Sequence, residues 1–209
     1  MNPPEAIVFV VDDDPSVRTG LARLLKSVGL TAAMFASAPE FLEEVTPDKP
    51  GCVIVDLRLP AMSGLELQEQ LKARSLNLPI IFLTAFGTVP ASVRAMKAGA
   101  IDFLEKPVDD QTLIDAVFRA LELDRAQRAK QAEIQAVLDR FKSLTPREVE
   151  VFRLIITGKL NKQVAHELNT SEKTIKVHRA RILEKMHCQS LAELVRLAEK
   201  ASLHWTKVQ

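Results

Sequence analysis

The stretch Cys52-Val53-Ile54-Val55-Asp56-Leu57-Arg58-Leu59-Pro60 decides the fold. It is a short apolar run, rich in β-branched residues, that ends abruptly in the carboxylate of Asp56. Such a run, followed by Pro60 and Gly64, predicts a strand buried on both faces and then a tight loop. Ligands of open parallel sheets bind just beyond the carboxyl ends of the strands. Asp56 lies at such a point, although a lone acid there more often only caps the next helix.

Four other stretches carry the same strand signal, and helical spacing separates them. The predicted strands are residues 7–11, 32–35, 52–56, 79–84 and 102–106. The helices between them are expected near residues 15–28, 41–45, 64–71 and 89–97. Five strand–helix units in the first 120 residues predict an α/β doubly wound, five-stranded parallel sheet of the flavodoxin-like type.

The fifth helix shows no stop signal where this first domain should close. From Thr112 to Leu138 the sequence contains neither Gly nor Pro, and the middle, residues 124–133, is nearly all polar. We predict one long helix, with residues 121–141 as a semi-rigid linker whose middle is solvated. The first domain is then 1–120, and 142–209 form a second domain.

The second domain has the pattern of a small all-α, four-helix module. Thr145, Pro146 and Glu148 form a helix start with a capping box, and that helix should end before Gly158. Further helices are predicted at residues 161–168, 171–186 and 190–200. Asn169 is expected to take a left-handed conformation in the turn. The pattern gives no role for the tail that begins near Trp205.

The overall charge of +1 hides an asymmetry between the two halves of the chain. Residues 1–120 hold 11 Lys and Arg against 16 Asp and Glu, whereas residues 141–209 hold 13 against 7. The basic module is a candidate for nucleic acid. No apolar run is long enough to span a bilayer, no secretory signal is evident, and the two distant cysteines indicate reduced thiols. A cytoplasmic protein without membrane partners is expected.

Polar residues end four of the predicted strands at one edge of the sheet. They are Asp12 with Asp13, Asp56, Thr84 and Lys106. Clustered carboxylates repel one another and need a cation, and hard oxygen ligands suit Mg²⁺. One carboxylate could then attack phosphorus to give an aspartyl phosphate, with the lysine stabilising the transferring oxygens.

The first domain resembles the receiver domain of two-component response regulators. The residues that carry the resemblance are Val10 to Asp13, Asp56 to Pro60 with Gly64, Thr84-Ala85 and Lys106-Pro107. The resemblance implies that a sensor histidine kinase phosphorylates Asp56. It also implies that Asp13, Asp56 and the backbone carbonyl of Arg58 bind Mg²⁺, with Asp12 acting through water. Thr84 and Phe103 would form a switch pair, and Lys106, before a cis Pro107, would contact the phosphate.

On a helical wheel of residues 171–186, Ile175, Ile182 and Met186 fall on one face. The opposite face carries Lys173, Lys176, Val177, Ala180, Arg181 and Glu184. A short helix, a turn and a helix with a cationic outer face indicate a helix-turn-helix, although a solvated amphipathic helix has the same pattern. Arg179 points toward the buried side, and we predict that it is a structural anchor that pairs with Glu148.

Residues 144–148, 161–165 and 174–178 resemble the LuxR/NarL-type DNA-binding domain. The whole chain thus resembles a response regulator of the FixJ/NarL type. By this resemblance Lys176 and Val177 approach base edges of promoter DNA. Asn161, Lys162, Lys173 and Arg181 contact phosphates or groove walls. Ala180 departs from relatives that carry lysine there, so the operator contacts can differ.

The sequence therefore predicts a transcription factor that phosphorylation controls. Phosphorylated Asp56 would promote a homodimer, release the DNA-binding domain, or do both, and RNA polymerase would be a further partner. The alternative is a constitutive DNA-binding protein whose receiver-like domain is only a scaffold. A metabolic phosphatase is the other rival, but the sequence has no second catalytic cluster, so the chain is not expected to be a metabolic enzyme.

Overall fold

The computed structural model describes residues 6–205 of the chain, and only the backbone of residues 202–205. The chain divides into two compact units, Met1–Arg128 and Ala129–Gln209, which we describe separately. The division falls inside the segment that the sequence predicts to be a linker. Residues 206–209 of the C-terminal tail lie outside the described residues.

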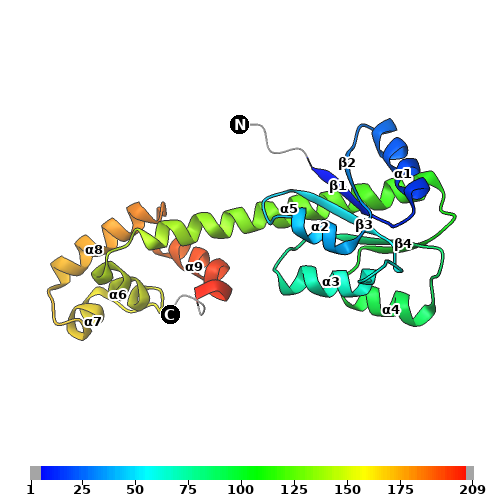
Figure 1. The fold of residues 1–209 in the computed structure, drawn as a ribbon. Helices are drawn as coiled ribbons and strands as arrows, with labels where there is room; N and C mark the ends of the chain where they lie inside the picture. The colour runs from blue at the N-terminus through cyan, green and yellow to red at the C-terminus, as the bar shows by residue number, and fades with distance from the viewer. Residues whose placement is uncertain (1–5, 206–209) are drawn as a thin grey trace. The chain divides into compact units, whose positions relative to one another are not determined.

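The described part of the first unit contains a five-stranded sheet in the order β2-β1-β3-β4-β5, with every neighbouring pair parallel (Figure 1). The strands are β1 (Ile7–Val11), β2 (Thr31–Phe35), β3 (Gly51–Val55), β4 (Ile80–Thr84) and β5 (Asp102–Glu105). The helices that follow them are α1 (Pro15–Ser27), α2 (Ala38–Glu44), α3 (Gly64–Ala73), α4 (Val89–Lys97) and α5 (Asp110–Lys142). The predicted doubly wound fold is confirmed.

Both faces of the sheet are covered, which explains why β3 is apolar without alternation. Val53 and Val55 pack into a core with residues of α2, α3 and α4. Cys52 and Ile54 pack into a second core with residues of α1 and α5. Each fully buried side chain of this size contributes about 1.5–3 kcal/mol. The sheet is therefore held rigidly under the loops that carry the polar residues.

The helix starts in this unit follow the capping residues in the sequence. Asp14 accepts a hydrogen bond from the backbone N–H of Ser16 at 2.7 Å and caps α1. Ser63 caps α3 and forms a capping box with Glu66. Asp56 is therefore not the cap of α3, and the simplest structural explanation for its carboxylate is excluded.

The long helix α5 runs without interruption, as predicted, but its polar middle is not wholly solvated. Asp124 is only 3% exposed, and its carboxylate accepts a bond from the N–H of Gly51 at 3.0 Å. Arg128 donates to Asp124 and to the carbonyls of Pro47 and Lys49. These contacts correct the prediction for this stretch: its first turn and a half is attached to the loop that precedes β3.

The described part of the second unit contains the end of α5 and four shorter helices. These are α6 (Pro146–Ile155), α7 (Asn161–Glu167), α8 (Glu172–Lys185) and α9 (Leu191–Trp205). Their apolar faces enclose one core, to which Val137 of α5 contributes. Asn169 has φ +48°, which confirms the left-handed turn, and α9 runs five residues beyond the predicted end at Lys200. None of the helices in residues 6–205 has the length and apolar character to cross a membrane.

Candidate functional site

The ammonium group of Lys106 joins the carboxylates at the ends of β1 and β3. Its Nζ donates to Asp12 Oδ2 at 2.6 Å and to Asp56 Oδ2 at 2.8 Å. The other carboxylate oxygen of each aspartate accepts a hydrogen bond from a nearby backbone N–H. Asp12 Oδ1 accepts from Asp14 at 2.9 Å, and Asp56 Oδ1 accepts from Arg58 at 3.0 Å. The structure thus brings together three of the predicted site residues from three strand ends.

The three side chains lie in a partly enclosed setting where charge interactions are strong. The side chain of Asp12 is 4% exposed, that of Asp56 13% and that of Lys106 19%. Burial alone would lower the pKa of Lys106, but its bonds to the two carboxylates outweigh burial and raise that pKa. The lysine therefore stays charged and holds Asp56 and Asp12 in place.

Thr84 and Phe103 lie at the same edge of the sheet. Thr84 is fully buried; its hydroxyl accepts a bond from the N–H of Phe86 at 3.2 Å, and its carbonyl accepts one from the N–H of Lys106. Phe103 is partly buried and stacks on Phe82, with ring centroids 5.8 Å apart. The structure thus gives Phe103 a packing role, and the switch role remains a prediction. The peptide bond before Pro107 is cis, as expected.

The other two predicted metal ligands are more exposed. Asp13 and Arg58 both have exposed side chains, and the Arg58 guanidinium lies 4.2 Å from the ring centroid of Phe86, which is 57% exposed. Among the side chains that the structure describes, those of residues 6–201, no three of His, Cys, Asp or Glu are arranged as a metal site. The donor chemistry nevertheless fits Mg²⁺, because carboxylate and carbonyl oxygens are its usual ligands.

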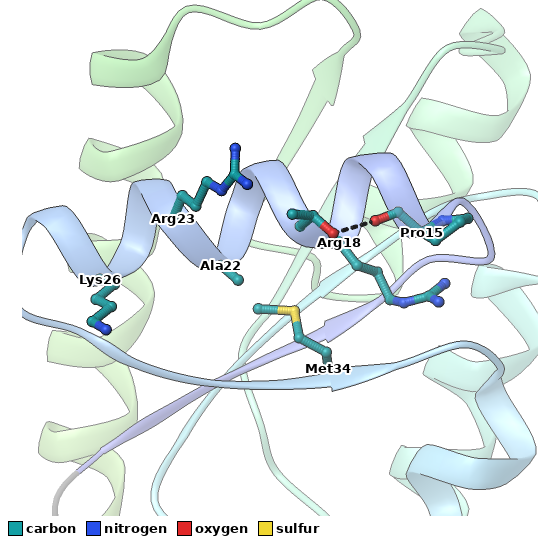
Figure 2. A pocket seen from close by; sticks show the side chains of 7 residues that line it. Pro15, Arg18, Ala22, Arg23, Lys26 and Met34 are labelled. Atoms are coloured by element: carbon teal, nitrogen blue, oxygen red, sulfur yellow. Dashed lines mark hydrogen bonds between the residues drawn. The ribbon is translucent and has the colours of Figure 1, made fainter.

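A cationic groove along α1 was not predicted from the sequence. It is lined by Pro15, Arg18, Thr19, Ala22, Arg23, Lys26 and Met34, and Figure 2 shows Met34 reaching from β2 toward the helix. Arg18 also donates to the backbone carbonyl of Asp12 at 2.6 Å. Spacing alone could have placed the cations on one side of α1. The bond from Arg18 to the carbonyl of Asp12 depends on how α1 packs beside β1.

The second candidate site is the outer face of α8. Ile175, Ile182 and Met186 are buried, as the wheel predicts. The opposite face is exposed and carries Lys173, Lys176, Val177, Ala180, Arg181 and Glu184. Lys162 of α7 is exposed, whereas Asn161 is half-buried and contacts Arg179. The arrangement presents a cationic helix face of the kind that enters the major groove.

The predicted pairing of Arg179 with Glu148 is wrong. Glu148 is 2% exposed and bonds to Lys185 at 2.6 Å, in addition to closing the capping box of α6. Arg179 instead donates from Nη1 to Oδ1 of Asn161 at 2.8 Å. It is half-buried and does anchor one helix to another, but the helix that it reaches is α7.

We expect the second unit to lose stability in acid through Glu148. Burial opposes the charged form, but the bonds from Lys185 and Thr145 outweigh it and hold the pKa of Glu148 below its usual value of 4.5. The group therefore contributes stability above pH 4.5, and this contribution is lost as the pH falls through the folded-state value.

Thermal melting of the full chain, followed by circular dichroism, can check this at about pH 6 and about pH 3.5. Glu148→Gln should melt lower than wild type at the higher pH, and the gap should narrow at the lower one. A gap that stays constant would show that the charge of Glu148 does not contribute to stability.

The sequence matches two known families, one in each unit. Residues 8–118 match the family described as response regulator receiver domain. Residues 142–198 match bacterial regulatory proteins of the luxR family. These matches cover the sheet edge with Asp56 and the helices α6 to α8.

Named relatives align with this chain across both units. The chain is 47% identical to nodulation protein W of Bradyrhizobium diazoefficiens over 195 residues, which cover 93% of this chain and 86% of that protein. It is 42% identical to the transcriptional regulatory protein FixJ of Azorhizobium caulinodans, with 93% of each chain covered.

Solved structures give the same result. The response regulator StyR is 49% identical, with a TM-score of 0.84 and coverage of 94% of this chain and 99% of that one. Full-length FixJ from B. japonicum is 38% identical, with a TM-score of 0.57 and coverage of 96% and 98%. The chain therefore belongs to the response regulators that join a receiver domain to a luxR-type DNA-binding domain.

Proposed function

We propose that transfer of a phosphoryl group to Asp56 controls the binding of promoter DNA by the second unit. The observation that carries the proposal is the ammonium of Lys106 between Asp56 and Asp12. It holds together an otherwise repelling pair of carboxylates at the ends of β1 and β3. A domain that served only as a scaffold would have no use for this arrangement.

The transfer itself requires little more than positioning and charge stabilisation. A carboxylate oxygen of Asp56 attacks the phosphorus of a phosphohistidine on a sensor kinase. The P–O bond forms as the P–N bond breaks, and the imidazole leaves with the electron pair. Lys106 can then pair with the phosphate oxygens, and the Thr84 hydroxyl can donate to one of them.

A divalent cation completes the proposed site. Asp13, Asp56 and the carbonyl of Arg58 would bind Mg²⁺, and Asp12 would act through a bound water. When bound, the ion would neutralise charge on the transferring oxygens. The residues of this chain would orient Asp56 through the bonds from Lys106 and from the N–H of Arg58.

The proposed output is a homodimer that binds promoter DNA. Phosphorylation would alter the surface formed by α4, β5 and α5, and α4 exposes Val89, Val93 and Met96 there. A dimer would place two α8 helices about one turn of DNA apart. Lys176 and Val177 would read base edges. Asn161, Lys162, Lys173 and Arg181 would contact phosphates, and RNA polymerase would be recruited in the cytoplasm, where bacterial promoters lie.

The test is the molar mass by light scattering, with and without acetyl phosphate and Mg²⁺. Wild type should shift from 23.2 kDa toward twice that mass, whereas Asp56→Asn should take up no phosphate and stay monomeric. Asp48→Asn, an exposed acid in the loop between α2 and β3, is the matched control and should behave as wild type.

If wild type takes up phosphate without a change in mass, the output is release of the DNA-binding unit instead of dimerisation. Uptake by Asp56→Asn would contradict the assignment of the acceptor. If wild type takes up no phosphate, the chain is better explained as a constitutive DNA-binding protein.

A further inference from the structure

We propose that Arg179 is a positioning residue for DNA binding, which acts by orienting the side-chain amide of Asn161. The inference rests on the proposed function, in which Asn161 contacts a phosphate of the DNA. It goes beyond that function by giving a role to a cation that does not lie on the cationic face of α8.

The position of Arg179 separates it from the other cations of this helix. It lies at 40° from Ile175 on the helical wheel, on the side that packs in the core. It is half-buried, whereas Lys176 and Arg181 are exposed. The guanidinium therefore reaches across to α7, where it meets Asn161 at 2.8 Å.

The chemistry of the pair fixes which way the amide faces. A guanidinium has donors and no acceptor, so Asn161 must turn its oxygen to Arg179. Its NH₂ group then points away from the guanidinium, and it has two donors for an anionic ligand. Asn161 is the first residue of α7 and remains partly exposed. Without Arg179 the amide could turn its oxygen outward and repel a phosphate.

The experiment is a double-mutant cycle on the full chain, phosphorylated with acetyl phosphate and Mg²⁺, with a random-sequence DNA duplex of about 20 base pairs as the probe. Phosphate contacts dominate such binding, so the operator need not be known. Arg179→Met should weaken binding about fivefold when Asn161 is present, and less than about twofold in an Asn161→Ala background. Arg179→Lys, which keeps one charged donor, should restore part of the loss.

Arg181→Met provides the matched control, because it removes the same group from the exposed face of the same helix. Its loss of affinity should be equal in both backgrounds, and it should reduce the salt dependence of binding. An equal loss for Arg179→Met in both backgrounds would overturn the positioning role while leaving the proposed DNA face intact. Absence of binding by wild type, or no effect of Arg181→Met, would overturn both.

A further variant tests the donor role of Asn161 with Arg179 left in place, so its result does not depend on whether Arg179→Met folds. Asn161→Asp keeps an acceptor for Arg179 but replaces the NH₂ donors with a charge that repels phosphate. It should bind DNA at least as weakly as Asn161→Ala while melting no lower than wild type. Binding at the wild-type level by Asn161→Asp would overturn the inference.

Discussion

Replacing Asp124 with alanine should lower the free energy of unfolding of the first unit by about 3 kcal/mol. The side chain of Asp124 is 4% exposed, and its carboxylate accepts bonds from the N–H of Gly51 and from the guanidinium of Arg128. Alanine at position 124 leaves the N–H of Gly51 without an acceptor and the guanidinium of Arg128 without its counter-charge. The side chain of Arg128 is 32% exposed and can regain water, which keeps the expected loss at the lower end for buried ion pairs.

Each unit contains one buried cysteine, so thiol alkylation can follow each unit separately in the full chain. Burial, reinforced by the charge of Asp124, raises the pKa of the Cys52 thiol to about 12. Burial also raises the pKa of Cys188. Both thiols should therefore resist alkylation near neutral pH until their own unit unfolds.

The measurement is the urea concentration at which each cysteine becomes half alkylated in a short pulse. In Asp124→Ala the midpoint for Cys52 should fall by roughly 1–2 M, and that for Cys188 should not move. Asp124→Asn keeps an acceptor and should cost about 1 kcal/mol. Asp115→Ala, on the exposed side of α5, should change the midpoint little. An unchanged Cys52 midpoint in Asp124→Ala would show that these contacts add no stability.

The contact of α5 with the loop before β3 also shows where sequence patterns stop being informative. Leu113, Val117 and Ala120 form a buried stripe of α5 in the structure, and position 124 continues it at helical spacing. An aspartate on that stripe normally marks the end of burial. Arg128 lies one turn further along the helix, but the other partner, the N–H of Gly51, is apparent only once the start of β3 is beside the helix.

The acidic site was largely predictable because parallel strands bring their carboxyl ends to one edge. That rule alone placed Asp12, Asp56 and Lys106 together. The pairing of Arg179 was not predictable in the same way. The helical wheel predicts that the side chain of Arg179 points toward the core. Which residue it pairs with, Asn161 or Glu148, depends on how α6 and α7 each pack against α8.

Replacing Gly64 with alanine should slow phosphorylation of Asp56 by about 100-fold and also destabilise the first unit. An added Cβ would lie 2.4 Å from the backbone oxygen of Asp56 and 3.0 Å from the ring of Phe82. Neither group is a flexible side-chain end, so the backbone that carries Asp56 must move. In catalytic sites a displacement of about 1 Å can cost about 100-fold in rate.

Two effects of this substitution oppose each other, and their sizes decide the outcome. Alanine is favoured over glycine in a helix by about 1 kcal/mol, and Gly64 begins α3. The cost of overpacking is typically about 1–3 kcal/mol and falls here on main-chain atoms that cannot rotate away. The steric cost should therefore win, and the Cys52 midpoint in urea should fall instead of rising.

Gly20→Ala separates the two effects, because Gly20 lies inside α1 and an added Cβ there meets nothing within 4 Å. That variant should raise the Cys52 midpoint and take up phosphate from acetyl phosphate at the wild-type rate. If Gly64→Ala behaves like Gly20→Ala, the loop after β3 tolerates a side chain against the Asp56 carbonyl. The position of Asp56 would then depend on Lys106 and not on the close approach of α3.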